Sequence, residues 1–268
     1  MPQSKYIHGE TDTEEVTRLE KQARFLSRWI LDGVEVGPGA RLLDLACGTG
    51  AMARRLRARL PDVFLTGCDL SRTQLAEARR AQRHEDDRYP LVNCDAALLP
   101  FRAGTFDAVH CSWLLEHVPP AAMGRILREA RRVLAPGGSA YFCEVEDDSF
   151  HVWPRLPLVE EAFSHVWRAQ AEGGGDPIVG RKLWGLCTEA GFTSVAVTPT
   201  TLHVHAGSPA GYYRASLEEF GEILRSAEHT LPGHLRGRLD EAVGQFLALE
   251  ATPGSSFTYT FFKARARR

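Results

Sequence analysis

An acidic residue followed by two glycines is the feature of this 268-residue chain whose residue types and spacing most directly indicate chemistry. Apolar residues lead into Asp44, the chain then passes through Gly48 and Gly50, and a helix-forming stretch begins at Ala51. A strand, a glycine turn and a helix in this order let a ligand lie against bare backbone at a helix N-terminus. Two nucleotide-derived ligands use this geometry, NAD(P) and S-adenosylmethionine (SAM), and the residues around the turn must distinguish them.

The glycine spacing by itself fits a dinucleotide site. Gly48, Gly50 and Ala53 match the pattern G-x-G-x-x-G/A, and Asp69 follows roughly 20 residues later, where an acid that binds the ribose belongs. Asp44 favours SAM instead, because a carboxylate beside the turn repels an anionic pyrophosphate and attracts the cationic sulfonium and ammonium groups of SAM. An NAD(P)-dependent oxidoreductase remains the alternative interpretation.

The glycine run resembles motif I of the class I SAM-dependent methyltransferases, with Ala46 at a position where many members have a glycine. Later segments of the chain extend this resemblance in the expected order. They are the predicted strands Phe64–Asp69, Leu91–Ala96 and Phe106–Ser112, and the turn Pro136-Gly137-Gly138 before a fifth strand. The resemblance is specific over residues 40–145 and looser elsewhere, and it implies that SAM is the cofactor.

The resemblance also implies a role for the polar residues that end the strands. An acid at the position of Asp69 accepts hydrogen bonds from the ribose hydroxyls, and one at the position of Asp95 meets the adenine amino group. A loop carboxylate or a helix cap is the alternative for each acid, and for Asp69 the alternative is an N-cap. The predicted cofactor-binding residues are Asp44, Gly48, Gly50, Asp69, Asp95, Ser112, Tyr6 and Arg18.

Two of these residues come from a segment near the N-terminus. Tyr6–Gly9 with Arg18, and the later stretch Gly174–Arg181, resemble bacterial methyltransferases that modify small natural products. This resemblance implies that Tyr6 and Arg18 close over the methionine end of SAM and that Arg18 pairs with its carboxylate. Alternatively, Tyr6 belongs to a polar tail and Arg18 to a solvated helix surface.

His117 and Glu144 are the candidate catalytic residues. Methyl transfer from SAM requires a positioned nucleophile and, where needed, a base that takes its proton. His117 follows the fourth strand and has a side chain that titrates near neutral pH, although local packing is its alternative role. Glu144 belongs to an acidic cluster at the end of the fifth strand, where a solvent-facing carboxylate is the alternative. Trp113 and Asp147 are the candidate substrate-binding residues, and for Trp113 the alternative is a core aromatic.

Alternating strands and helices between residues 40 and 146 predict a doubly wound, Rossmann-like α/β fold. The resemblance implies a mostly parallel sheet of seven strands, with an antiparallel last strand between strands five and six. Strand five is predicted over Ser139–Glu146, strand six over Ser194–Val204 and the last strand over Ser256–Phe262. The chain is predicted to be one domain, with a core over about 35–206 plus 255–266 and a helical lid from 1–34, 147–177 and 207–250.

Composition excludes several kinds of partner. A net charge of −2 gives no general attraction to nucleic acid or anionic membranes. The sequence shows no signal peptide and no apolar run approaching the ~20 residues that span a bilayer, so a cytoplasmic location is expected. Six cysteines without a C-x-x-C pair predict packing residues and no metal site.

The segment after the fourth strand bears on the methyl acceptor. Methyltransferases of nucleic-acid bases and protein amides commonly have Asn/Asp-Pro-Pro-Tyr there, whereas this chain has Cys111–Leu114. A Pro-Cys nucleophile for pyrimidine C5 chemistry is also absent. The sequence therefore favours a small-molecule acceptor, with secondary metabolites as the expected class and methylation at O, N or C left open. A protein that binds SAM without turnover is a further alternative.

Overall fold

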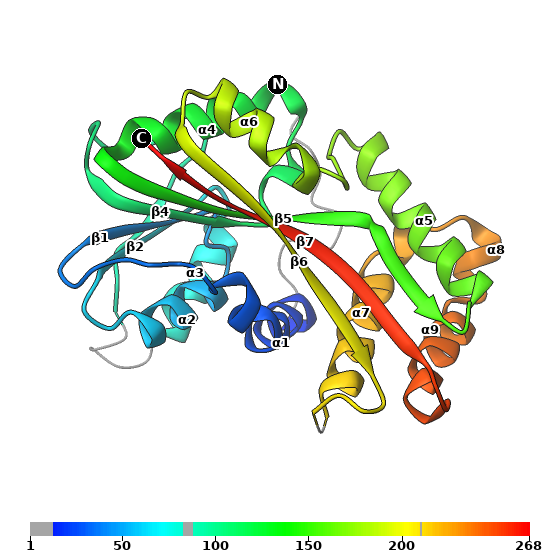
Figure 1. Cartoon of the computed structure of the whole chain (residues 1–268). Coiled ribbons are helices and arrows are strands. Elements are labelled where there is room, and N and C mark those ends of the chain that lie inside the picture. The colour runs from blue at the N-terminus through cyan, green and yellow to red at the C-terminus, as the bar shows by residue number, and fades with distance from the viewer. Residues whose placement is uncertain (1–12, 83–87, 210) are drawn as a thin grey trace.

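A seven-stranded sheet forms the centre of the molecule (Figure 1). The computed structural model describes residues 13–82, 88–209 and 211–268, and the strand order within them is β3-β2-β1-β4-β5-β7-β6. Only β7 is antiparallel to its neighbours, which confirms the predicted fold class. The strands are β1 (Arg41–Leu45), β2 (Phe64–Asp69), β3 (Leu91–Asn93), β4 (Phe106–Ser112), β5 (Leu134–Trp153), β6 (Thr193–His205) and β7 (Ser256–Arg267).

Helices cover both faces of this sheet. In Figure 1, α4 and α6 lie above it, whereas α1, α2 and α3 lie below it. The helices are α1 (Thr13–Ile30), α2 (Ala51–Arg59), α3 (Arg72–Ala81), α4 (Pro120–Val133), α5 (Pro157–Glu172), α6 (Leu183–Glu189), α7 (Tyr212–Ser226), α8 (Gly233–Arg236) and α9 (Leu239–Leu247), with 3-10 turns η2 (Leu115–His117), η3 (Gly180–Lys182), η4 (Glu228–Thr230) and η5 (Ala248–Ala251). Among these helices, none combines the length and apolar character that a membrane span requires.

Two hydrophobic cores result, one on each face of the sheet. Successive side chains of a strand point to opposite faces. Leu42 and Ala108 therefore pack into the core between the sheet and helices α1 and α2. Leu43 and Val109 pack into the core between the sheet and helices α4 and α6. Burial on both faces explains why the central strands are almost continuously apolar in sequence.

Strand β5 is longer than predicted. The prediction ended it at Glu146 and assigned 147–177 to a lid, but residues 147–153 continue the strand and pair with the start of β7. The strand register shifts between Glu146 and His151. Beyond the shift, buried Phe150 and Val152 alternate with exposed residues, which is the period of a half-buried strand.

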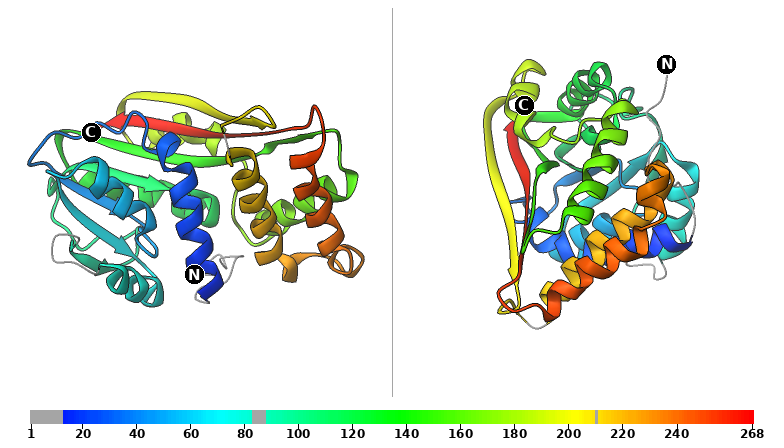
Figure 2. Two further views of the ribbon diagram at one scale, coloured as in Figure 1. Left: turned by 90° about the horizontal axis from the view of Figure 1, so that it is seen from below. Right: turned by 90° about the vertical axis from the view of Figure 1, so that its right-hand side faces the viewer.

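The extended parts of β5, β6 and β7 support a second group of helices. Figure 2 shows α7 and α9 on the same side of the long strands as α1. Phe150 of β5 and Phe257 of β7 contact aromatic rings from these helices and from α5: Phe163, Phe220 and Phe246. This aromatic cluster fixes α5 and α7 beside the carboxyl ends of the central strands.

The strand order reverses between β1 and β4, which lie side by side. Ligands of open α/β sheets bind outside the carboxyl ends of the strands at such a reversal. Asp44 of β1, Asp69 of β2 and Ser112 of β4 are at or next to these ends. The fold therefore brings the predicted polar residues of three strands to one edge.

Candidate active site

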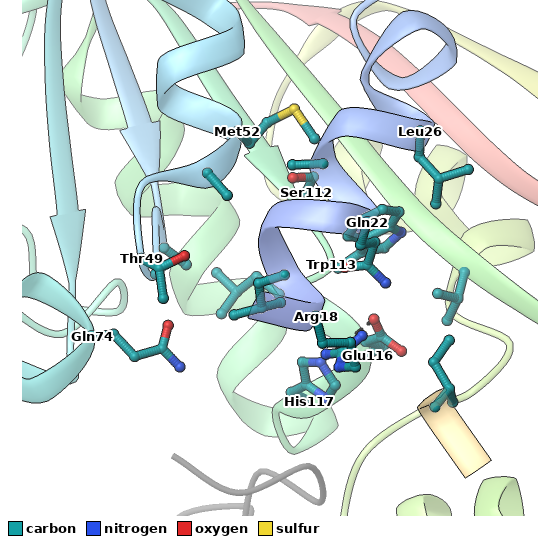
Figure 3. A pocket seen from close by; sticks show the side chains of 18 of the residues that line it. Arg18, Gln22, Leu26, Thr49, Met52, Gln74, Ser112, Trp113, Glu116 and His117 are labelled. Atoms are coloured by element: carbon teal, nitrogen blue, oxygen red, sulfur yellow. Dashed lines mark ion pairs between the residues drawn. The ribbon is translucent and has the colours of Figure 1, made fainter. Parts of the chain in front are cut away.

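A cavity of about 670 Å³ opens at this edge of the sheet. Its wall comes from the glycine turn after β1, the loops after β2 and β4, and parts of α1, α5, α7 and β7. Figure 3 shows Thr49 and Gln74 on one side of the cavity and Arg18, Glu116 and His117 on the other. We call these two sides the glycine side and the acidic side.

The glycine turn is held by Asp69. The backbone N–H of Gly48 donates to Asp69 Oδ2 and that of Ser71 donates to Oδ1, both at 2.8 Å. Burial raises the pKa of Asp69, while these backbone hydrogen bonds oppose the rise. Asp69 is not the N-cap of α3, because Ser71 holds that position and its Oγ accepts from the N–H of Gln74. Asp69 lines the cavity as predicted.

Gly48 requires the absence of a side chain. Its φ of +54° lies in the left-handed region, and a Cβ atom there would lie 2.6 Å from Oε1 of Gln74. Both residues line the cavity, so a ligand can approach the Gly48 backbone closely. Ala46 lies in the same turn with φ +58°. This conformation favours glycine and fits the position where many related sequences have one.

Asp44 is a buried residue with one paired carboxylate oxygen and one that lacks a partner among the described residues. Its side chain is 3% exposed, and Oδ1 lies 2.8 Å from Nδ1 of His110, the residue that faces it on β4. Oδ2 has no hydrogen-bond partner among the described residues, although Asp44 lines the cavity. A buried polar atom of this kind needs a partner, and its place in the cavity wall leaves it open to a group of a bound ligand. Sequence reasoning missed His110, whose role depends on strand register.

Two predicted cofactor residues do not line the cavity. Gly50 is the N-cap of α2, and its φ of +72° turns the chain into that helix. Asp95 is exposed, and its Oδ1 accepts a hydrogen bond from the N–H of Ala97 at 2.8 Å in a local turn. Thr49 lines the cavity instead, and its buried Oγ1 has no hydrogen-bond partner within the described part of the chain. The position of Thr49 between Gly48 and Gly50 is the sequence feature that could have predicted its place in the cavity wall.

Ser112 and Trp113 line the middle of the cavity where β4 ends (Figure 3). Trp113 has φ +55°, a conformation that costs a bulky residue free energy and that often occurs at functional sites. Its backbone N–H donates to the carbonyl oxygen of Cys143 on β5 at 2.9 Å, which holds the turn. The ring is therefore part of the cavity wall.

Arg18 of α1 lines the cavity in a buried position, so it is not a solvated helix residue. Its Nη1 lies 3.4 Å from Oε1 of Glu219 on α7, which is also buried. This ion pair joins α1 to α7 across the cavity wall. Glu219 is about 200 residues away in sequence and was not predicted. Tyr6, the other predicted N-terminal residue, lies outside the described residues.

Glu144 lies beneath the cavity and does not line it. It is fully buried, and its carboxylate accepts hydrogen bonds from the backbone N–H groups of Leu114, Leu115 and Glu116 at 2.9–3.3 Å. Burial raises its pKa to about 8, and the nearby charge of Glu116 adds to the rise. Glu144 therefore holds the turn that carries Glu116 and His117, and its predicted catalytic role has no direct access to the cavity in this structure.

Glu116 and His117 line the acidic side. Glu116 is 7% exposed, and its Oε2 accepts a hydrogen bond from Nε2 of Gln170 on α5 at 3.0 Å. Oε1 of Glu116 lies 3.5 Å from Nε2 of His117, whose side chain is 20% exposed. His117 is therefore partly exposed within the cavity wall. Sequence reasoning singled out His117 and missed its neighbour Glu116.

Asp147 lines the same side and is 6% exposed. Its Oδ1 accepts a hydrogen bond from the hydroxyl of Tyr259 on β7 at 2.7 Å. Burial, and after it the charge of Glu116, raise the pKa of Asp147 well above its ordinary value. The predicted substrate-binding residue is thus in the cavity, next to a tyrosine from the last strand.

One cluster outside the cavity has the composition of a metal site. Glu161 and His165 of α5 and His234 of α8 hold ligand atoms that all lie within 4.8 Å of one another. Glu161 and His234 are exposed, and their 3.3 Å separation is that of an ordinary hydrogen bond. The cluster takes no part in the cavity.

Comparisons with known proteins agree with this geometry. Residues 42–138 match the model of a family described as "Methyltransferase domain". The chain is 32% identical over 184 residues to an uncharacterized 37.1 kDa transposon protein of Streptomyces fradiae, which covers 67% of this chain and 51% of that protein. It is 37% identical over 133 residues to 27-O-demethylrifamycin SV methyltransferase of Amycolatopsis mediterranei, covering 49% and 47% respectively. The chain thus spans about half the length of these curated relatives.

Among solved structures, the fold is similar to a phosphoethanolamine N-methyltransferase of Haemonchus contortus, solved with phosphomonomethylethanolamine and S-adenosylhomocysteine (SAH). The TM-score is 0.53 at 20% identity, over 93% of this chain and 52% of that one. This likeness shows the fold. The glycine turn beside a buried acid and the strand order agree with the family match, so residues 42–138 are a methyltransferase domain of the class I, SAM-dependent type.

Proposed function

We propose that this chain transfers the methyl group of SAM to a small-molecule acceptor held on the acidic side of the cavity. One observation carries the proposal. A single cavity joins a glycine turn, beside which Asp44 Oδ2 has no partner among the described residues, to a second wall of aromatic and polar side chains from α5, α7 and β7. The first wall fits the cofactor, and the second leaves room for an acceptor beside it.

The residues of the glycine side hold the cofactor in this proposal. Asp44 pairs with its cationic groups, Gly48 lets it approach the backbone, and Asp69 binds the ribose hydroxyls through the second lone pairs of its oxygens. From the acidic side, Arg18 of α1 pairs with the carboxylate of the methionine end. Thr49 adds a hydroxyl that has no partner among the described residues.

When bound, SAM supplies a methyl group already activated by the sulfonium. The chain's own residues then hold the acceptor in line with that methyl group and exclude water from the path. His117 or a carboxylate of the acidic side takes the proton of an acceptor that must lose one. Trp113, on the wall between the two sides, limits how the acceptor can approach.

A secondary metabolite is the acceptor class that we favour. The relative from Amycolatopsis mediterranei acts on a rifamycin, as its name states, and the cavity wall carries large aromatic side chains suited to an apolar acceptor. The assay is formation of SAH from SAM with a panel of amine, phenol and alcohol acceptors. Acceptor-dependent SAH is expected. A folded protein that binds SAM but forms no SAH with any of them would instead be a SAM-binding protein without turnover.

Asp69→Ala is expected to weaken SAM binding about ten- to hundredfold while the protein stays folded. The change removes a carboxylate that hydrogen-bonds the ribose and also anchors Gly48, and such bonds to charged groups contribute about 1.5–3 kcal/mol. Calorimetric titration with SAM measures the loss. Asp62→Ala, which removes an exposed acid outside the cavity wall, is the matched control. Equal affinity in both variants would remove Asp69 from the cofactor site.

His117→Asn separates the two roles left open for this residue. We expect turnover to fall roughly 10²–10⁴-fold if His117 takes the acceptor's proton, with little change in SAM affinity and with loss of the acidic limb of the pH–rate profile. A purely local packing role would instead lower the melting temperature and leave the rate per folded molecule unchanged. The comparison requires kcat, SAM affinity and melting temperature on the same preparation.

A further inference from the structure

The acidic side of the cavity contains two buried carboxylates, and the charge of one acts on the other. Glu116 comes from the turn after β4 and Asp147 from β5, and both are more than nine-tenths buried. Glu116 is engaged by Gln170 and lies near His117. Asp147 uses Oδ1 for the hydroxyl of Tyr259, whereas its Oδ2 makes no hydrogen bond or ion pair within the described part of the chain. Asp147 therefore brings to the cavity wall a carboxylate oxygen that has no partner among the described residues.

The arginine and the histidine on the acidic side each lie near an acidic residue. Arg18 lies 3.4 Å from Glu219, and His117 lies 3.5 Å from Glu116. The polar side chains that α5 and β7 bring to this side of the cavity are those of Gln170 and Tyr259, which are neutral. Among the described residues, three buried acids line this side of the cavity with one arginine and one histidine, so the acidic side attracts a cation and repels an anion.

Aromatic rings complete the wall around these acids. Phe163 and Trp167 of α5 stack at a ring separation of 5.5 Å. Phe220 of α7 and Tyr259 of β7 meet edge to face at 5.0 Å. All four line the cavity. Aromatic faces bind ammonium groups through cation–π attraction as well as apolar groups, which suits an acceptor with a charged nitrogen on an apolar body.

We propose that the methyl acceptor is an organic amine, bound as its ammonium cation between Asp147 and Glu116 against the aromatic wall. The proposal rests on the proposed function and names the substrate class of the same cavity. Asp147 accepts the proton that leaves the nitrogen and passes it to water. The freed lone pair then forms the nitrogen–carbon bond as the carbon–sulfur bond of SAM breaks, and the electron pair of that bond stays on sulfur. The positive charge that develops on nitrogen remains beside the carboxylates.

Binding is tested with the SAH-loaded protein at pH 7, by calorimetry. The probes are phenethylamine and tryptamine, each compared with the alcohol and the carboxylate of the same carbon skeleton. We expect each amine to bind at least about tenfold more tightly than its alcohol, and the carboxylates not to bind. Equal affinity of alcohol and amine, preference for the carboxylate, or no amine binding at millimolar concentration would overturn the proposal.

Asp147→Asn provides the matched variant. Asparagine keeps an oxygen that can accept the hydroxyl of Tyr259, so the fold and SAH affinity should be unchanged, while amine affinity should fall about tenfold or more. Asp148→Asn changes the neighbouring acid, which is exposed and lies outside the cavity wall, and should bind amines like the parent. An unchanged amine affinity in Asp147→Asn would contradict the proposal.

Proton release gives a readout that a structural role would not produce. Burial and the charge of Glu116 raise the pKa of Asp147, and an ammonium group beside this carboxylate would lower that pKa again. Titrations in two buffers of different ionisation enthalpy should show proton release with the parent and less with Asp147→Asn. SAH affinity is measured first in every preparation. Failure to bind SAH would refute the proposed function, whereas SAH binding without amine preference would refute only the amine assignment.

Discussion

Gly48→Val is expected to abolish SAM binding, with a loss of affinity of at least about a hundredfold. Valine at φ +54° is strained by more than about 1–2 kcal/mol, and its Cβ atom would lie 2.6 Å from Oε1 of Gln74. The branched side chain would then occupy the space through which the cofactor meets the backbone. Calorimetric titration with SAM measures the loss, and the melting temperature reports whether the variant folds.

Gly37→Val is the control for this change. Gly37 is exposed outside the cavity wall, its φ is not in the left-handed region, and an added Cβ atom there meets no heavy atom within 4 Å. Gly48→Ala keeps the strain with a smaller side chain and should bind SAM with intermediate affinity. Unchanged SAM binding in a folded Gly48→Val protein would show that the cofactor does not contact this turn.

Glu144→Ala is expected to destabilise the protein by about 3–5 kcal/mol. The change leaves the backbone N–H groups of Leu114, Leu115 and Glu116 without their acceptor in a buried position, and each unsatisfied group costs about 1–3 kcal/mol. Glu144→Gln should lower the free energy of unfolding less than Glu144→Ala does. The amide oxygen of glutamine still accepts a hydrogen bond, although its amide nitrogen faces a backbone N–H that is also a donor. Urea unfolding measures both, and a loss below about 1 kcal/mol in the alanine variant would contradict the assigned role.

The pH dependence of stability tests the same group. The pKa of Glu144 is raised to about 8 from an ordinary 4.5, so the folded protein holds this proton more tightly than the unfolded chain. The stabilisation is fully present below about pH 4.5 and is lost as the pH rises through about 8. Glu144→Gln should therefore show a shallower decline in stability between these pH values than the parent. An identical decline in both proteins would mean that Glu144 does not titrate in this range.

Sequence patterns were sufficient for the central fold. The glycine turn and the acids at Asp44 and Asp69 are local signals, because strand, turn and helix follow one another within a few residues. The length of β5 was not predicted, because the register shift after Glu146 interrupts the alternation that identifies a strand.

The candidate site was predicted only in part, for a different reason. Position at the end of a strand does not fix the direction of a side chain, so Glu144 was assigned to the cavity although it points beneath it, and Asp95 although it closes a local turn. Glu219 and Tyr259 reach the cavity from elements far along the chain. Their contribution depends on the packing of α7 and β7, which no local pattern contains.

One titration tests the central claim most directly, that this cavity holds SAM. Purified protein is titrated with SAM, with SAH and, separately, with NADH, and each titration is repeated with Asp44→Asn. We expect SAH to bind at one site per chain and NADH not to bind. SAM should bind more weakly to the variant, because its cationic groups lose the carboxylate partner that the buried Oδ2 atom provides. Binding of NADH without binding of SAH, or SAM affinity unaffected by Asp44→Asn, would contradict the account.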